Sequence, residues 1–205
     1  KHFITTSIEH KSVLEAMKRL ETLGCEVDYV APDHTGRISA EALLALVKDT
    51  TLLVSVMHIN SETGIIQPVE EIGEALSKTN VYFHVDATQS FGKLNDVIRN
   101  MKYDMLSFTA HKFGGPQGVG GLVLRRKRYK LPPITSLFCG GQQERGIRPG
   151  TTPVALVAGM TTAAEIADSE CAEQQAKCAA IKEDLLKQLE GVRYTINGAP
   201  EHCIS

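Results

Sequence analysis

An aspartate and a lysine each follow an apolar segment of this chain. Asp86 ends the run VYFHVD, and Lys112 follows DMLSFTAH and precedes a glycine-rich stretch. A lysine in such a place can bind phosphate, form an ion pair or attack a carbonyl group as a Schiff-base nucleophile. A carboxylate can hold a proton on a ring nitrogen. Whether the two side chains act together depends on the elements that position them.

Apolar runs with strand character alternate with helical patterns along the chain. We expect strands over residues 2–8, 26–31, 51–58, 81–87, 104–111 and 120–126, and helices over residues 12–24, 39–49 and 69–79. A long helical stretch is expected from Thr152-Pro153 to about Glu190, with a break near Ser169. The alternation predicts an α/β fold, with three α/β/α layers and a mainly parallel central sheet.

Polar side chains gather where three of these strands end. They are Asn60, Ser61, Glu62, Asp86, Gln89, Thr109, His111 and Lys112. Open α/β sheets bind ligands outside the carboxyl ends of their strands, so we expect these side chains to share one edge. A lysine and a carboxylate there suit pyridoxal 5′-phosphate (PLP), because the lysine forms an imine with it and the acid keeps the pyridine nitrogen protonated. The Thr109 hydroxyl and the His111 ring can donate to its phosphate.

Five stretches of the chain together match a known family. They are SIEHKSV, MHINSETGIIQPVEEIG, HVDATQSFGK, LSFTAHKFGGPQGVGGLVLRR and GGQQERGIRPGTTPV, and they cover most of residues 1–165. In order and spacing they resemble the cysteine desulfurases of the class V, PLP-dependent aminotransferase-like superfamily (fold type I). The resemblance implies an enzyme that removes sulfur from L-cysteine, giving L-alanine and an enzyme persulfide for sulfur transfer.

The resemblance also implies roles for single residues. Lys112 matches the lysine that binds PLP covalently, Asp86 the partner of the pyridine nitrogen and Gln89 the residue that bonds the phenolic oxygen. His10 matches the imidazole stacked on the cofactor ring, so Lys112 and His10 are the candidate catalytic residues. The implied cofactor-binding residues are Asp86, Gln89, Thr109, His111, Lys112, Ser61 and Thr151, the last reaching the phosphate of the neighbouring subunit. No metal is implied.

The chain departs from the family pattern in three ways. Ser61 stands where a second asparagine is usual, so it offers a shorter side chain with only a hydroxyl group. Thr109 replaces a common serine but keeps the hydroxyl. The family's phosphate loop would lie upstream, and its persulfide-forming cysteine and substrate-binding arginine downstream. We therefore expect residues 1–165 to be a PLP-binding large domain, incomplete at its N-terminus. Residues 166–205 would be a linking helix and the start of a small C-terminal domain.

The composition is that of an ordinary globular protein. Hydrophobic residues make up 42% and the formal net charge is −2, so no basic field points to a nucleic acid partner. No apolar run reaches the roughly 18 residues that cross a bilayer. Five cysteines without a CxxC pair indicate reduced thiols. With the resemblance, this predicts a cytoplasmic homodimer that acts on L-cysteine and passes sulfur to an acceptor protein, without nucleic acid or membrane partners.

Several alternatives stay open at this stage. The resemblance also allows a selenocysteine lyase, another class V enzyme or a non-catalytic dimerising scaffold, and it does not choose among sulfur acceptors. His58 and His84 lie inside apolar runs, so we interpret both as packed core histidines. The basic run Arg125–Arg128 is interpreted as a solvated face.

Overall fold

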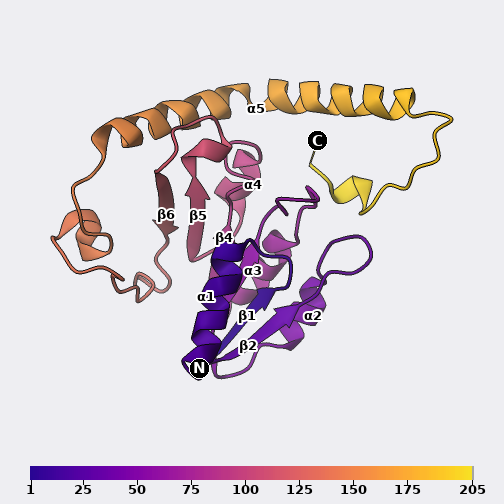
Figure 1. Ribbon diagram of the computed structural model, residues 1–205. Coiled ribbons are helices and arrows are strands. Elements are labelled where there is room, and N and C mark those ends of the chain that lie inside the picture. Colours follow the sequence, from indigo (N-terminus) through magenta and orange to yellow (C-terminus); the bar gives the residue numbers. More distant parts are fainter. Residues whose placement is uncertain (205) are drawn as a thin grey trace.

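The computed structural model describes residues 1–204 and centres on one six-stranded sheet (Figure 1). Its strands are β1 (His2–Thr6), β2 (Glu26–Val30), β3 (Thr51–Met57), β4 (Tyr82–Asp86), β5 (Met105–Thr109) and β6 (Gly120–Leu124). They lie in the order β2-β1-β3-β4-β5-β6. The first five are parallel, and β6 pairs antiparallel with β5. The expected α/β fold with a mainly parallel sheet is confirmed.

Helices connect and cover these strands. They are α1 (Lys11–Thr22), α2 (Ala40–Ala45), α3 (Val69–Ser77), α4 (Asn95–Asn100) and α5 (Val154–Gln188), with the 3₁₀ turns η1 (Ala110–Lys112), η2 (Gln143–Gly146) and η3 (Pro200–His202). The sequence did not predict α4. Its six residues bury a single apolar side chain, Ile98, and so show no helical period.

One face of the sheet is apolar and forms the core. Register places Ile4 beside Val54 and Val54 beside Phe83, so their side chains lie in one row. Helices α2, α3 and α4 supply the other side of this core with the buried residues Ala40, Leu43, Val69, Ile72, Leu76 and Ile98. Burying this continuous apolar surface is the main force that holds the sheet and helices together.

The opposite face carries a row of hydrogen bonds. The Thr5 hydroxyl donates to the Ser55 carbonyl (2.9 Å), and the Ser55 hydroxyl lies 2.8 Å from Nδ1 of His84. Nε2 of His84 lies 3.0 Å from the Ser107 hydroxyl. His84 is thus hydrogen-bonded through both ring nitrogens and is only partly buried, which corrects its interpretation as a core histidine. His58 is 1% exposed, in agreement with that interpretation.

Helix α5 is one continuous helix where the sequence predicted a break. It runs without interruption for 35 residues, so the predicted break near Ser169 is wrong. The Ser169 hydroxyl donates to the Ile166 carbonyl (2.9 Å), within the helix, instead of capping a new one. Figure 1 shows α5 extending along one side of the sheet, after which the chain returns toward it. There Cys203 forms an antiparallel bridge with Ile65.

Candidate active site

The parallel strands β1, β3, β4 and β5 bring most of the predicted site residues to one edge of the sheet. These residues are His10 after β1, Ser61 after β3, Asp86 and Gln89 at and after β4, and Thr109, His111 and Lys112 at and after β5. We call this edge the candidate rim. Thr151 is different: it is exposed in the loop between η2 and α5 and makes no hydrogen bond with the other candidates in the described chain.

Asp86 is the last residue of β4 and is only 7% exposed. It pairs in register with Met57 on one side and Ser107 on the other, which fixes its place in the middle of the sheet. The backbone N–H of Thr88 donates to Oδ1 (2.9 Å). Within residues 1–204, Oδ2 receives no hydrogen bond. A carboxylate oxygen without a donor, on a side chain that is nearly buried, is suited to a ligand that brings its own N–H.

Lys112 lies on the short turn η1 rather than on a strand. Strand β5 ends at Thr109, two residues earlier than predicted, and the Gly115 N–H closes the turn on the Ala110 carbonyl (2.9 Å). The Thr109 hydroxyl lies 3.0 Å from Nδ1 of His111, so these two candidate phosphate ligands are already side by side. Lys112 is exposed, and no ion pair or hydrogen bond engages its ammonium group within the described residues.

His10 is the N-cap of α1. The Ser12 N–H donates to Nδ1 of its ring (3.2 Å), and the Ser12 hydroxyl lies 2.8 Å from the same atom. Because a backbone N–H only donates, Nδ1 carries no proton in this arrangement, and the proton of the neutral ring is on Nε2. The cap therefore fixes the tautomer and leaves Nε2–H available for a ligand on the rim.

Glu9 is a rim residue that sequence reasoning missed. It is 5% exposed, and its Oε1 accepts from the Thr6 hydroxyl (2.7 Å) and the Met57 N–H (2.8 Å). Its Oε2 is buried without a partner among the described residues. Burial raises the pKa of Glu9 to about 7, against the lowering effect of its hydrogen bonds, and the negative charge of Asp86 adds to the rise. The only sequence signal was its position beside His10.

Asn60 organises the turn after β3. Its Oδ1 accepts from the N–H groups of Glu62 (3.0 Å) and Thr63 (2.9 Å), and its Nδ2 donates to the Ile8 carbonyl (3.0 Å). Asn60 and Glu9 thus join the turn before His10 to the end of β3. Ser61 is exposed, and its hydroxyl donates to Oε1 of the adjacent Glu62 (3.3 Å). Its assignment as a cofactor ligand stays a prediction.

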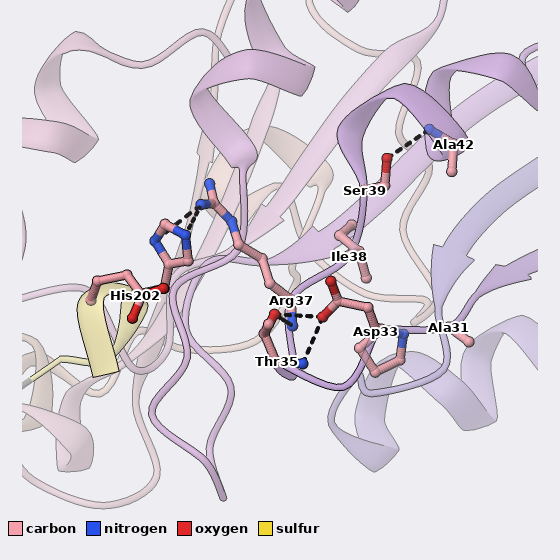
Figure 2. A pocket seen from close by; sticks show the side chains of 10 residues that line it. Ala31, Asp33, Thr35, Arg37, Ile38, Ser39, Ala42 and His202 are labelled. Carbon is pink, nitrogen blue, oxygen red and sulfur yellow. Dashed lines mark hydrogen bonds between the residues drawn. The ribbon is translucent and has the colours of Figure 1, made fainter. Parts of the chain in front are cut away.

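Two other polar clusters lie outside the candidate rim. A hollow of about 430 Å³ opens after β2, where Nη1 of Arg37 lies 3.1 and 2.9 Å from the ring nitrogens of His202 (Figure 2). No predicted site residue lines it.

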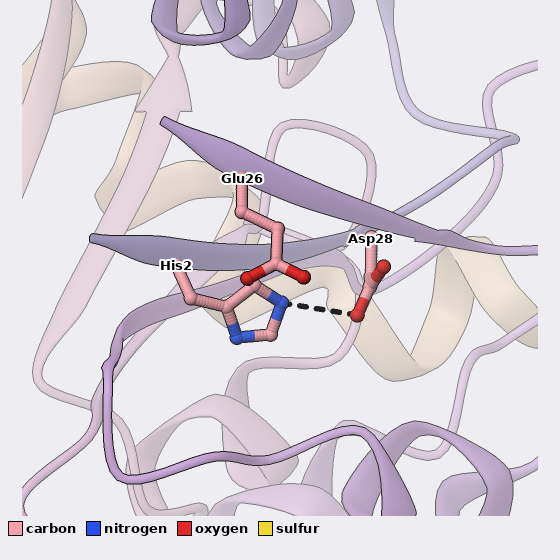
Figure 3. Close-up of side chains that lie close together, drawn as sticks. All are labelled: His2, Glu26 and Asp28. Carbon is pink, nitrogen blue, oxygen red and sulfur yellow. Dashed lines mark hydrogen bonds and ion pairs between the residues drawn. The ribbon is translucent and has the colours of Figure 1, made fainter. Parts of the chain in front are cut away.

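The second cluster lies at the amino ends of β1 and β2, opposite the candidate rim. Nε2 of His2 lies 3.0 Å from Asp28 there, and Glu26 is beside them (Figure 3). Lys48 donates to Glu26 (2.6 Å) and Asp28 (3.4 Å), so this cluster is accounted for as a structural ion-pair network.

Comparison with known proteins gives the family. The chain matches the aminotransferase class-V family over residues 1–203, and it belongs to that family. It is 43% identical over 208 residues to the cysteine desulfurase IscS of Serratia proteamaculans, covering 100% of this chain and 50% of that protein. The chain therefore spans about half the length of this curated relative. No helix within residues 1–204 is long and apolar enough to cross a bilayer.

Solved structures give the same result for the fold. DndA from Streptomyces lividans superposes with a TM-score of 0.95 at 42% identity, covering 99% of this chain and 57% of that one. SspA, solved in complex with cysteine, superposes with a TM-score of 0.72 at 40% identity, covering 80% of this chain and 47% of that one. The class V family consists of PLP enzymes, so the family makes PLP the cofactor to test on this rim.

Proposed function

We propose that the full-length protein is a PLP-dependent cysteine desulfurase, which converts L-cysteine to L-alanine and an enzyme persulfide. Family membership and relatives that are named cysteine desulfurases support the proposal. The observation that carries it is the free Oδ2 of Asp86, on a nearly buried carboxylate at the edge where Lys112 has no partner within the described chain. A protonated ring nitrogen and an aldehyde carbon would fit these two groups.

The residues on the rim fit PLP in kind as well as in place. Lys112 would be the point of attachment, Asp86 would accept from the ring nitrogen and Gln89 would bond the phenolic oxygen. Thr109 and His111 would donate to the phosphate. When bound, PLP supplies an electron sink that stabilises negative charge on the α-carbon of the substrate.

The chain's own residues then have separable tasks. Asp86 holds the proton of the ring nitrogen, and the Lys112 amine moves the proton at the α-carbon of L-cysteine. Nε2 of His10 supplies a second proton-transfer group, since its Nδ1 is occupied by Ser12. A cysteine thiolate elsewhere in the full-length protein attacks the substrate sulfur. That sulfur leaves with the thiolate as a persulfide, and the remaining carbon skeleton takes up a proton to become L-alanine.

The organisation of the full-length protein forms part of the same proposal. Residues 1–165 would be the cofactor-binding large domain, and residues 166–205 would lead into a small domain that supplies the thiolate. A homodimer would bring Thr151 to the phosphate in the neighbouring subunit. The exposed position of Thr151 in a loop that ends before α5 is compatible with such a reach. A sulfur-acceptor protein would take up the persulfide sulfur.

The test is L-alanine formation by the full-length protein. Lys112→Ala should abolish turnover of L-cysteine, and Asp86→Asn should lower it by at least about a hundredfold, because an amide cannot stabilise the charged ring nitrogen. Lys102→Ala, at an exposed lysine before β5, should leave turnover unchanged. Retained turnover in Lys112→Ala contradicts the proposal, and turnover confined to selenocysteine identifies a lyase instead.

A further inference from the structure

Lys93 lies beside the candidate rim and has no part in the chemistry proposed for it. It is half-buried in the turn between β4 and α4, and its Nζ donates to Oε1 of Gln89 (3.2 Å). No carboxylate lies within ion-pair distance of it among residues 1–204. Burial lowers the pKa of Lys93, and the positive charge of Lys112 lowers it further. Withdrawing an ammonium group from water without a carboxylate partner is costly, which makes its contact with Gln89 the feature to explain.

The fold holds the backbone of Lys93 on two sides. Gly92, with φ +81°, leaves no room for a side chain, since a Cβ there would lie 2.8 Å from Cβ of Phe113. On the other side, the Lys93 carbonyl accepts hydrogen bonds from Cys171 (3.0 Å from Sγ) and Gln175, both on α5. Tertiary packing therefore fixes the backbone from which the Lys93 side chain reaches Gln89, four residues earlier.

The contact between the two side chains determines the orientation of the Gln89 amide. A lysine ammonium carries only donors, so it binds the oxygen end of a side-chain amide and never the NH₂ end. With Oε1 engaged by Lys93, Nε2 of Gln89 is turned the other way and has no acceptor among the described residues. An NH₂ group in that position is matched to an anionic oxygen of a ligand.

We propose that Lys93 is a positioning residue, which holds the Gln89 amide so that Nε2 donates to the phenolic oxygen of bound PLP. The inference rests on the proposed function, because it needs the cofactor on the rim. The contact acts on that one oxygen, through Gln89, and leaves the phosphate and the ring nitrogen to other residues.

The test compares two ligands in the full-length apoprotein by equilibrium binding: PLP and 3-deoxypyridoxal 5′-phosphate, which lacks the phenolic oxygen. The wild type should prefer PLP. Lys93→Met should lower this preference about tenfold, the value of one charge-assisted hydrogen bond, as should Gln89→Ala. Lys93→Arg should keep most of the wild-type preference for PLP. The double variant Lys93→Met/Gln89→Ala should lose no more of this preference than either single variant.

The preference is a ratio of two affinities in one variant, so a general loss of stability cancels. Lys127→Met removes another part-buried lysine, which bonds Asp104 far from Gln89, and should leave the ratio unchanged. A Lys93→Met ratio equal to that of the wild type, with Gln89→Ala reduced, overturns the inference and leaves the proposed function standing. A wild type that binds neither ligand overturns the proposed function itself.

Discussion

At the scale of single residues, the candidate rim holds two buried carboxyl groups in different surroundings. Asp86 keeps Oδ2 free, whereas Glu9 uses Oε1 to bind two donors and leaves Oε2 buried. Glu9 accepts its second hydrogen bond from the Met57 N–H. Met57 lies at the end of β3, beyond the last residue of β3 that pairs with β1. A proton on Glu9 removes one negative charge from the neighbourhood of Asp86, and the pKa of about 7 makes that proton present in near-neutral solution.

Glu9→Gln should change the pH dependence of stability. The folded-state pKa of Glu9 is raised from 4.5 to about 7, so between these values the folded state binds more protons than the unfolded state. Stability from this group is fully present below about pH 4.5 and is lost as pH rises through 7. The loss amounts to about 3 kcal/mol at 1.36 kcal/mol per pKa unit. The glutamine side chain does not titrate, so the variant should lack this loss of stability with rising pH.

The measurement is the thermal midpoint of full-length wild type and Glu9→Gln from pH 5 to 8. His58, whose pKa burial lowers to about 4, is present in both proteins, so its opposite effect cancels in the comparison. The wild-type midpoint should fall relative to the variant as pH rises. Parallel curves would show that Glu9 is ionised throughout.

At the scale of elements, the basic run after β6 is partly structural. Nζ of Lys127 lies 3.1 Å from Asp104, with the two side chains 13% and 12% exposed, and it also donates to the Val81 carbonyl. The guanidinium group of Arg125 lies 3.7 Å above the Tyr103 ring. The interpretation of this run as a solvated face is therefore wrong for these two residues. It holds for Arg126 and Arg128, which are exposed.

Lys127→Met should destabilise the protein by about 3 kcal/mol, because it leaves the Asp104 carboxylate part-buried without its cation. Arg126→Met provides the control. Among residues 1–204, this neighbouring exposed side chain bonds only the Tyr129 carbonyl, and its loss should cost less than about 0.5 kcal/mol. Urea denaturation of both variants gives the difference. Equal effects would mean that the Lys127–Asp104 pair contributes nothing beyond a surface contact.

The turn that carries Gln89 and Lys93 makes a second prediction at this scale. Gly92→Ala would strain a backbone at φ +81° and press Cβ against Phe113 (2.8 Å) and Ala167 (3.1 Å). Gly24→Ala is the matched control, since Gly24 has the same φ but nothing within 4 Å of the added Cβ. Both variants lose about 1 kcal/mol to backbone strain. Gly92→Ala should lose a further 1–3 kcal/mol or so from overpacking, and equal losses in denaturant titrations would contradict this packing.

At the scale of the whole molecule, the sequence predicted what depends on local period and order. The strands before Asp86 and Lys112 could be predicted because each is a continuous apolar run, and the parallel sheet followed from their alternation with helices. The burial of Glu9 depends on packing against β3, which is distant in sequence. The contact of Lys93 with Gln89 is local, but it depends on the conformation of the turn after β4, which has no periodic pattern. The break expected at Ser169 failed because a serine hydroxyl can bond within a helix.

The covalent attachment of PLP to Lys112 is tested most directly by borohydride reduction. The full-length protein is reduced in the presence of PLP, and the modified peptide is mapped by mass spectrometry. Reduction turns an imine into a stable secondary amine, so the attachment point survives digestion. We expect one pyridoxyl group, on Lys112, and a visible absorption band that shifts when L-cysteine is added before reduction. Modification of another lysine, Lys93 included, or no modification at all would contradict it.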